Sequence, residues 1–293
     1  MSKLDKALNK ARHDRESTGL SAVLESEKPV QNKLARAYEK ASSQQEKKDL
    51  LSAFRPVAEN TDKDIKLKYH KTRVLPPVEK ILEKQRILTH LRKPGFRDSY
   101  DYFCTQVLQR TREKGWNSLM VSSAYTGEGK TTTAINLALS IAREVQQTAL
   151  LVGANFRNPK VCTYFGLDED RPGLSDYLVN GSQISDLLFS PGIEKMVVLP
   201  SGKRVSSDKN FLGSPKMKSL VEELKSRYPD RYVIYDCPHV LDMPDTLVFT
   251  SYVDAVLLVV EAGRTPGQDV ERAVQTLTDR GVNIVGVLLN KAA

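Results

Sequence analysis

Six short apolar runs recur in the last two thirds of the chain, and helical segments lie between most of them. Some runs are apolar at every position, as in Val256-Leu257-Leu258-Val259-Val260, which is typical of a parallel sheet covered on both faces. The alternation of strand and helix predicts a layered α/β domain. We expect strands at 118–123, 148–153, 195–200, 231–236, 254–260 and 283–289, and helices near 130–144, 173–179, 214–228 and 266–280.

The first third of the chain has weaker patterns. Apolar residues at positions 4, 7, 8 and 11 predict a short amphipathic helix within residues 1–15, and the stretch up to residue 72 is mostly polar. Pro76-Pro77 opens a better helical segment to His90, Pro94-Gly95 interrupts it, and a further helix spans 97–114. We therefore expect a helical or partly disordered region at 1–95, followed at 96–293 by a three-layer α/β/α domain with a mostly parallel sheet.

Charge separates the same two parts of the chain. The net charge is +8 over 293 residues, but residues 1–95 carry 22 basic and 13 acidic residues, whereas the remainder carries 22 and 23. A basic segment suits anionic lipid, nucleic acid or an acidic protein, but it is also typical of a solvated leader. Few aromatic residues interrupt the basic ones, so we expect no nucleic-acid partner. Three scattered cysteines and a charged N-terminus without a signal pattern favour a protein of the cytoplasm.

Between the first apolar run and the first long helix lies a glycine-rich segment. From Ser122 to Thr132 it reads Ser-Ser-Ala-Tyr-Thr-Gly-Glu-Gly-Lys-Thr-Thr, a P-loop with Ala124 in place of the first glycine. Such a loop turns its backbone N–H groups inward, and the following helix adds its positive end, so phosphate binding is predicted. The lysine can reach the β and γ phosphates, and the next hydroxyl can ligate Mg²⁺. The predicted contacts to ATP and Mg²⁺ are Thr126, Gly127, Glu128, Gly129, Lys130, Thr131 and Thr132.

Other candidate residues follow later strands. The run Tyr232-Val233-Ile234-Tyr235 ends in Asp236, which can hold the metal's water shell opposite Thr131. Asp245 is either a further group near the metal or a helix N-cap. Asn290 ends the last strand, directly before Lys291, where such a pair can contact a purine base.

From Thr105 to Lys291 the chain resembles the bacterial tyrosine kinases (BY-kinases) of exopolysaccharide synthesis. The resemblance implies the P-loop NTPase fold, ATP·Mg²⁺ binding, self-association, and catalytic duties for Lys130, Asp236 and Arg157. The start, residues 4–12, is similar to kinases that work beside a separate membrane protein. This implies a transmembrane polysaccharide co-polymerase as partner and a place at the inner face of the bacterial membrane. The matching segments are Thr105–Leu108, Val121–Ala124, Gly127–Thr132, Ala134–Ala138, Arg157–Pro159, Gly173–Leu178, Leu199–Gly202, Asp236–Pro238 and Asp254–Val260.

Three departures from the family bear on catalysis. The family's second motif, Asp-x-Asp-x-Arg-x-Pro, reads Gly153-Ala-Asn155-Phe-Arg157-Asn-Pro here, so both acids are absent. The last tyrosine is Tyr252, so no C-terminal tyrosine cluster is expected. In the helix before the P-loop, where the family has Glu-x-x-Arg-x-x-Arg for ring assembly, this chain has Asp98, Asp101 and Cys104.

These departures leave several functions open. The first hypothesis is an ATP·Mg²⁺-binding regulator of polymer length or export with weak or lost kinase activity, because a phenol with a pKa near 10 needs a base and Asn155 cannot be one. The alternative is an active tyrosine kinase that phosphorylates in trans. A third is a positioning ATPase of the MinD/ParA type, although that group needs a lysine where this chain has Tyr125. A fourth is an interaction module with an unused nucleotide site.

Overall fold

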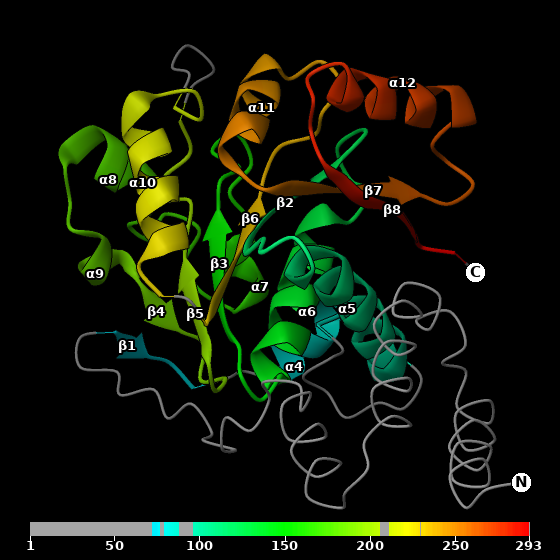
Figure 1. Cartoon of the computed structure of the whole chain (residues 1–293). Helices are drawn as coiled ribbons and strands as arrows, with labels where there is room; N and C mark the ends of the chain where they lie inside the picture. Colours follow the sequence, from blue (N-terminus) through cyan, green and yellow to red (C-terminus); the bar gives the residue numbers. More distant parts are fainter. Residues whose placement is uncertain (1–71, 77–78, 88–95, 206–210, 229, 293) are drawn as a thin grey trace, which may run out of the picture. The chain divides into compact units, whose positions relative to one another are not determined.

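A computed structural model describes residues 72–76, 79–87, 96–205, 211–228 and 230–292 (Figure 1). The chain divides into two compact units, Met1–Lys63 and Asp64–Ala293, and every described residue belongs to the second. The amphipathic helix expected within residues 1–15 therefore lies outside the described residues.

The described residues form one mixed sheet of eight strands, in the order β1-β4-β5-β3-β6-β2-β7-β8. Every neighbouring pair is parallel except β4 with β5. The mostly parallel α/β fold expected from the apolar runs is thus confirmed. The strands are β1 (Arg73–Val74), β2 (Ser118–Ser123), β3 (Thr148–Gly153), β4 (Phe189–Ser190), β5 (Met196–Leu199), β6 (Arg231–Asp236), β7 (Ala255–Glu261) and β8 (Ile284–Asn290).

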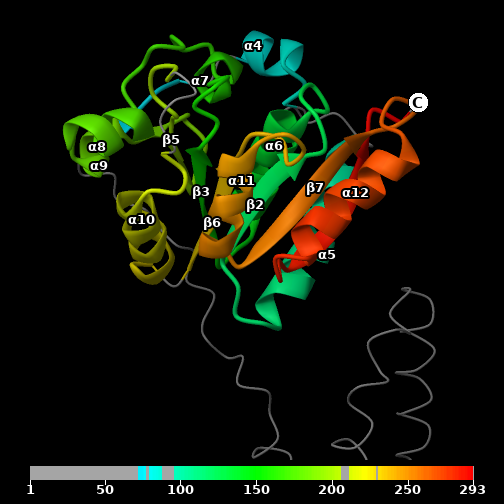
Figure 2. The ribbon, with the colours of Figure 1, turned by 90° about the horizontal axis from the view of Figure 1, so that it is seen from above.

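Helices cover both faces of the sheet, as Figures 1 and 2 show. One face carries α4 (Glu79–Lys84), α5 (Phe96–Arg112), α6 (Lys130–Arg143) and α7 (Val161–Tyr164). The other carries α8 (Leu174–Asn180), α9 (Ile184–Leu187), α10 (Pro215–Ser226), α11 (Pro244–Phe249) and α12 (Gly267–Thr278), with a 3₁₀ turn at Thr250–Tyr252. Each face has its own apolar core, which explains why the central strands are apolar at successive positions. No helix within the described ranges is long and apolar enough to cross a membrane.

The six strands and the four main helices expected from the sequence are all present, with ends shifted by a few residues at most. The strands β1 and β4 and the helices α7, α9 and α11 were not expected, because two to six residues are too few to show a period. Through β1, which pairs with β4, the segment before residue 96 joins the sheet. Leu82 and Ile87 are also buried in the core of the α6 face. The boundary between residues 95 and 96 stays a prediction.

The topology brings the chemistry to one edge of the sheet. Because β2, β3, β5, β6, β7 and β8 share a direction, their carboxyl ends lie at the same edge. The P-loop leaves β2, which lies between β6 and β7. Crevices outside the carboxyl ends of such strands are where open α/β sheets bind ligands.

Candidate nucleotide-binding site

The P-loop adopts the backbone that phosphate binding requires. Gly127 and Gly129 have φ angles of 88° and 92°, in the left-handed region that favours glycine. Gly129 is the N-cap of α6 and has no side chain to cap it, so the first-turn N–H groups can face a ligand. A side chain at Gly129 would also overlap the amide of Asn290. Glycine is therefore favoured at position 127 by conformation and at position 129 by both conformation and space.

Asp236 lies beside the first turn of α6. Thr131 Oγ1 donates to Asp236 Oδ2 over 2.8 Å, so the two residues assigned to one metal ion in the sequence analysis are neighbours. Burial raises the pKa of the Asp236 carboxyl to about 6, although Lys130 and Thr131 both oppose the shift. Within the described residues, Asp236 Oδ1 is buried and has no hydrogen-bond partner. A buried carboxylate oxygen beside a hydroxyl and a lysine fits a hydrated divalent cation.

The loop after β3 carries no carboxylate from Gly153 to Pro159, since both acids of the family motif are replaced. Asn155 is buried, and its Oδ1 accepts a hydrogen bond of 3.2 Å from the backbone N–H of Asn158. Its side chain therefore stabilises the turn of its own loop. Arg157 donates to Asp245 Oδ2 over 3.2 Å, and Asp245 lies in the first turn of α11 after the N-cap Met243. Asp245 is thus a partner of Arg157 and not the N-cap.

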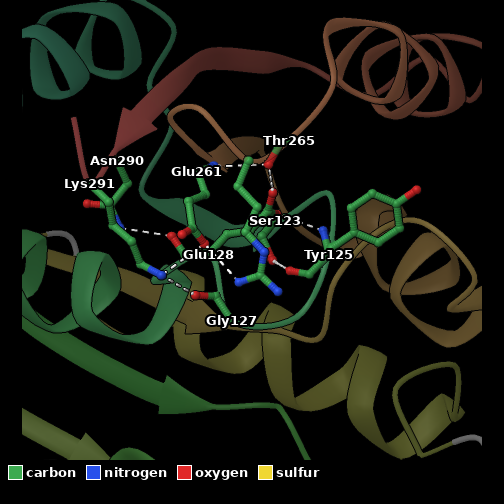
Figure 3. A network of polar contacts seen from close by, with 9 residues as sticks. Ser123, Tyr125, Gly127, Glu128, Glu261, Thr265, Asn290 and Lys291 are labelled. Atoms are coloured by element: carbon green, nitrogen blue, oxygen red, sulfur yellow. Dashed lines mark hydrogen bonds and ion pairs between the residues drawn. The ribbon is translucent and has the colours of Figure 1, made fainter. Parts of the chain in front are cut away.

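Glu128 holds the P-loop from inside (Figure 3). Its side chain is buried, and its Oε2 accepts a hydrogen bond of 2.6 Å from the backbone N–H of Tyr125. Its Oε1 accepts a hydrogen bond from Thr265, in the turn between β7 and α12. Glu128 therefore links the loop to the neighbouring strand connection, and its carboxylate is already engaged without a ligand.

The end of β8 contacts the same loop (Figure 3). Asn290 Nδ2 donates to the Glu128 carbonyl over 2.8 Å, and Lys291 Nζ donates to the Gly127 carbonyl over 2.9 Å. Lys291 also forms an ion pair of 2.9 Å with Glu261, at the end of β7. The proposed contact of Asn290 with a purine base stays a prediction, and these bonds give the two side chains a role in holding the P-loop.

Sequence reasoning missed three residues near this site. Tyr164 on α7 shares a hydrogen bond of 3.0 Å with Thr132 Oγ1, and no sequence signal pointed to it. His239 lies three residues after Asp236, so its position could have drawn attention. Burial lowers the pKa of His239 and the charge of Lys130 lowers it further, so the imidazole is neutral at pH 7. The third is Ser201, which follows β5 and approaches Gly153.

Other candidate chemistry is absent from the part of the chain that the structure describes. No group of three or more His, Cys, Asp or Glu residues there could hold a metal ion. The three cysteines are buried and unpaired. Cys104, which aligns with one of the family's ring-assembly positions, packs in the core of the α6 face. Asp101, at another of those positions, lies 3.8 Å from Arg143.

The chain is similar to proteins of known fold and family. Residues 118–280 match the AAA domain family. The chain is 33% identical to the tyrosine-protein kinase CpsD of Streptococcus pneumoniae serotype 4 over 192 residues, 66% of this chain and 82% of that protein. It is 29% identical to the succinoglycan biosynthesis transport protein ExoP of Rhizobium meliloti over 64% of this chain, but over only 23% of that longer protein.

A solved structure agrees with these sequence matches. The kinase domain of the Escherichia coli tyrosine kinase ETK superposes with a TM-score of 0.63 at 25% identity, covering 81% of this chain and 90% of that domain. Sequence and structure therefore point to the same group of P-loop proteins. The chain belongs to the bacterial tyrosine kinase family.

Proposed function

We propose that this protein binds ATP·Mg²⁺ and regulates the length or export of an exopolysaccharide, with weak or lost tyrosine kinase activity. The observation that carries the proposal is the contrast within one site. The P-loop and the Thr131–Asp236 pair have the geometry of a nucleotide site, whereas Gly153 and Asn155 supply no acid. Binding groups are present, and the groups that would activate a tyrosine are absent.

The roles of the binding groups follow from their positions. The ammonium group of Lys130 would neutralise the β and γ phosphates, and the loop N–H groups would donate to their oxygens. Thr131 and Asp236 would hold the cation, which when bound neutralises phosphate charge. Arg157, held by Asp245, places a positive charge on the loop where the family motif keeps its arginine.

The missing step is proton removal. A tyrosine that attacks the γ phosphate must lose its phenolic proton, and a positioned base contributes about 10²–10⁴-fold to such a step. The amide of Asn155 cannot take that proton, and its Oδ1 already accepts from Asn158. Phosphoryl transfer from bound ATP would therefore be slower than in an intact kinase. The bound nucleotide then acts mainly as a conformational signal.

The family's place of action extends the proposal. A relative of this chain is named as a succinoglycan transport protein. We infer that this chain works at the inner face of the bacterial membrane beside a transmembrane polysaccharide co-polymerase, with self-association as a further property. A MinD/ParA-type role is disfavoured because Tyr125 replaces the signature lysine, and its hydroxyl is 2.8 Å from Arg272 Nη2 on α12.

One experiment tests both halves of the proposal. The purified chain is titrated with a fluorescent ATP analogue and Mg²⁺, and is then incubated with labelled ATP alone and with candidate partners. We expect the unaltered chain to bind the analogue and to form little phosphotyrosine. Lys130→Ala should lower the affinity at least about tenfold, because the phosphate charge is no longer neutralised. Lys216→Ala is the matched control, because Lys216 lies on α10 and donates to the Tyr177 carbonyl.

The outcomes separate the hypotheses. Strong phosphotyrosine that Lys130→Ala abolishes would establish an active kinase instead. No nucleotide binding with or without Mg²⁺ would refute the proposal and leave the interaction module.

A further inference from the structure

A hydroxyl group from the next strand lies where the missing acid of the second motif would begin. Ser201 follows β5, the neighbour of β3, and its side chain is buried. A Cβ atom added to Gly153 would lie 2.5 Å from Ser201 Oγ and 2.8 Å from the Ser201 backbone nitrogen. The space for a side chain at position 153 is therefore closed by Ser201. An acid could enter there only if the turn after β5 moved.

The turn that carries Ser201 is held by its backbone. Leu174 N–H donates to the Pro200 carbonyl and Ser175 N–H to the Ser201 carbonyl, both over 2.8 Å. Side chains at Gly173 or Gly202 would overlap this junction, so the N-terminus of α8 packs closely on the turn. In contrast, among the described residues Ser201 Oγ has no hydrogen-bond partner. The backbone hydrogen bonds therefore fix the position of the Ser201 hydroxyl, and the hydroxyl itself adds no hydrogen bond to the turn.

The hydroxyl and the Asp236 carboxylate flank the same glycine. Gly153 is the register partner of Asp236 across β3 and β6, so the two residues face the same side of the sheet. That side carries α6, since Leu151 and Ile234, two residues earlier on each strand, pack in its core. Asp236 Oδ1 is also buried and without a hydrogen-bond partner among the described residues. Buried polar atoms in native proteins nearly always have partners, so these two atoms, on either side of the same glycine, are both available to a group bound beside the Thr131–Asp236 pair.

We propose that Ser201 Oγ and Asp236 Oδ1, on either side of Gly153, hold the water shell of the cation that accompanies the nucleotide. This inference rests on the proposed function and deepens it. Ser201 is a positioning residue, because a hydroxyl contacts the cation's water molecules and adds no charge. With glycine at position 153, the site lacks the negative charge and the base of the family's acid, and the Ser201 hydroxyl still offers a hydrogen bond. Cation and nucleotide are therefore retained while proton transfer is lost.

Ser201→Ala tests the assignment. The titration with the fluorescent ATP analogue is run with Mg²⁺ and again with EDTA. We expect the affinity with Mg²⁺ to fall about three- to tenfold, the range of one lost hydrogen bond, and the affinity with EDTA to be unchanged. The unfolding temperature without ligand should be unchanged or higher, because the substitution removes a buried hydroxyl that has no partner.

The matched control is Ser140→Ala. Ser140 Oγ is also buried and without a partner among the described residues, but it lies in the third turn of α6, away from the loop. It should leave both affinities unchanged. Equal affinity of Ser201→Ala and the unaltered chain with Mg²⁺ would overturn the inference, as would a drop in unfolding temperature with equal losses in both titrations. If the unaltered chain binds no nucleotide, the proposed function fails and this inference fails with it.

Discussion

Asp236 is a carboxyl group that lies almost wholly inside the protein. Its surroundings raise its pKa from 3.8 to about 6, with burial as the largest cause, so the folded protein keeps the protonated form to a higher pH. Lys130 and Thr131 limit the shift without cancelling it. A bound cation would reverse this balance, because it favours the charged form. Without a cation, the buried carboxylate of Asp236 therefore lowers the stability of the protein at neutral pH.

The pH dependence of stability gives a test of that cost. A folded-state pKa above the unfolded value means that the folded chain holds a proton which the unfolded chain releases between about pH 4 and pH 6. The stabilising effect of this proton is complete below pH 4 and is lost as the pH rises through 6. The free energy of unfolding is measured in urea without ligands for Asp236→Asn and for the unaltered chain. We expect the value for the variant minus that for the unaltered chain to increase by about 2–3 kcal/mol from pH 4 to pH 7.

Thr246→Val serves as control, since Thr246 Oγ1 is buried and partnerless among the described residues but does not titrate in this range. A constant difference between Asp236→Asn and the unaltered chain across the pH range would show that folding does not raise the pKa of Asp236.

At the scale of elements, Asp254 connects β2, β7 and α10 at the amino ends of the central strands. Asp254 lies directly before β7. Its Oδ2 accepts hydrogen bonds from Ser118 N–H over 3.0 Å, Ser118 Oγ over 2.8 Å and Asn117 N–H over 3.1 Å. Lys225 near the end of α10 forms an ion pair with its Oδ1. Burial alone would raise the pKa of Asp254, but the bonds from Lys225 and Ser118 outweigh it and lower the pKa. One carboxylate thus aligns β2, β7 and α10.

Loss of that carboxylate should destabilise the whole domain. We expect Asp254→Ala to lower the free energy of unfolding by about 2–4 kcal/mol, since it leaves two N–H groups and a lysine without their acceptor. Thermal unfolding followed by circular dichroism measures the effect. Glu223→Ala removes an exposed ion pair with Arg227 on the same helix and should cost less than about 1 kcal/mol. Similar values for the two variants would mean that Asp254 does not align the strands.

The same elements show what a sequence can predict. Continuous apolar runs revealed the long strands, and the P-loop and Asp236 were found because their residue types carry their chemistry. The antiparallel β4 was missed because two residues show no alternation. The contact of Ser201 with Gly153 and the contact of Lys291 with Gly127 were not predicted, because both depend on strand order. The sequence places Lys291 164 positions from Gly127, and only the sheet brings them together.

At the scale of the molecule, the ends of several strands together form the candidate site. β2 supplies the P-loop, β6 supplies Asp236, and β7 and β8 supply Glu261 and Lys291. Since β8 is the last strand on its side of the sheet, it has one neighbouring strand, β7, among the described residues. The loop that would bind phosphate is therefore connected by hydrogen bonds to an edge of the sheet, and the conformation of each should influence the other.

Lys291→Ala tests this connection. The ammonium group of Lys291 bonds the Gly127 carbonyl and pairs with Glu261, so its loss frees one side of the P-loop. A freer loop must be ordered on binding, and we expect the affinity for ATP with Mg²⁺ to fall about three- to tenfold. Global stability should change by less than about 1 kcal/mol, because the pair is partly exposed. Amide exchange at Gly127 and Gly129 should rise.

Arg264→Ala is the matched control, since Arg264 pairs with the same Glu261 oxygen over 3.2 Å. If both variants weaken binding equally, the charge of Glu261 and not the bond to the Gly127 carbonyl would govern the loop.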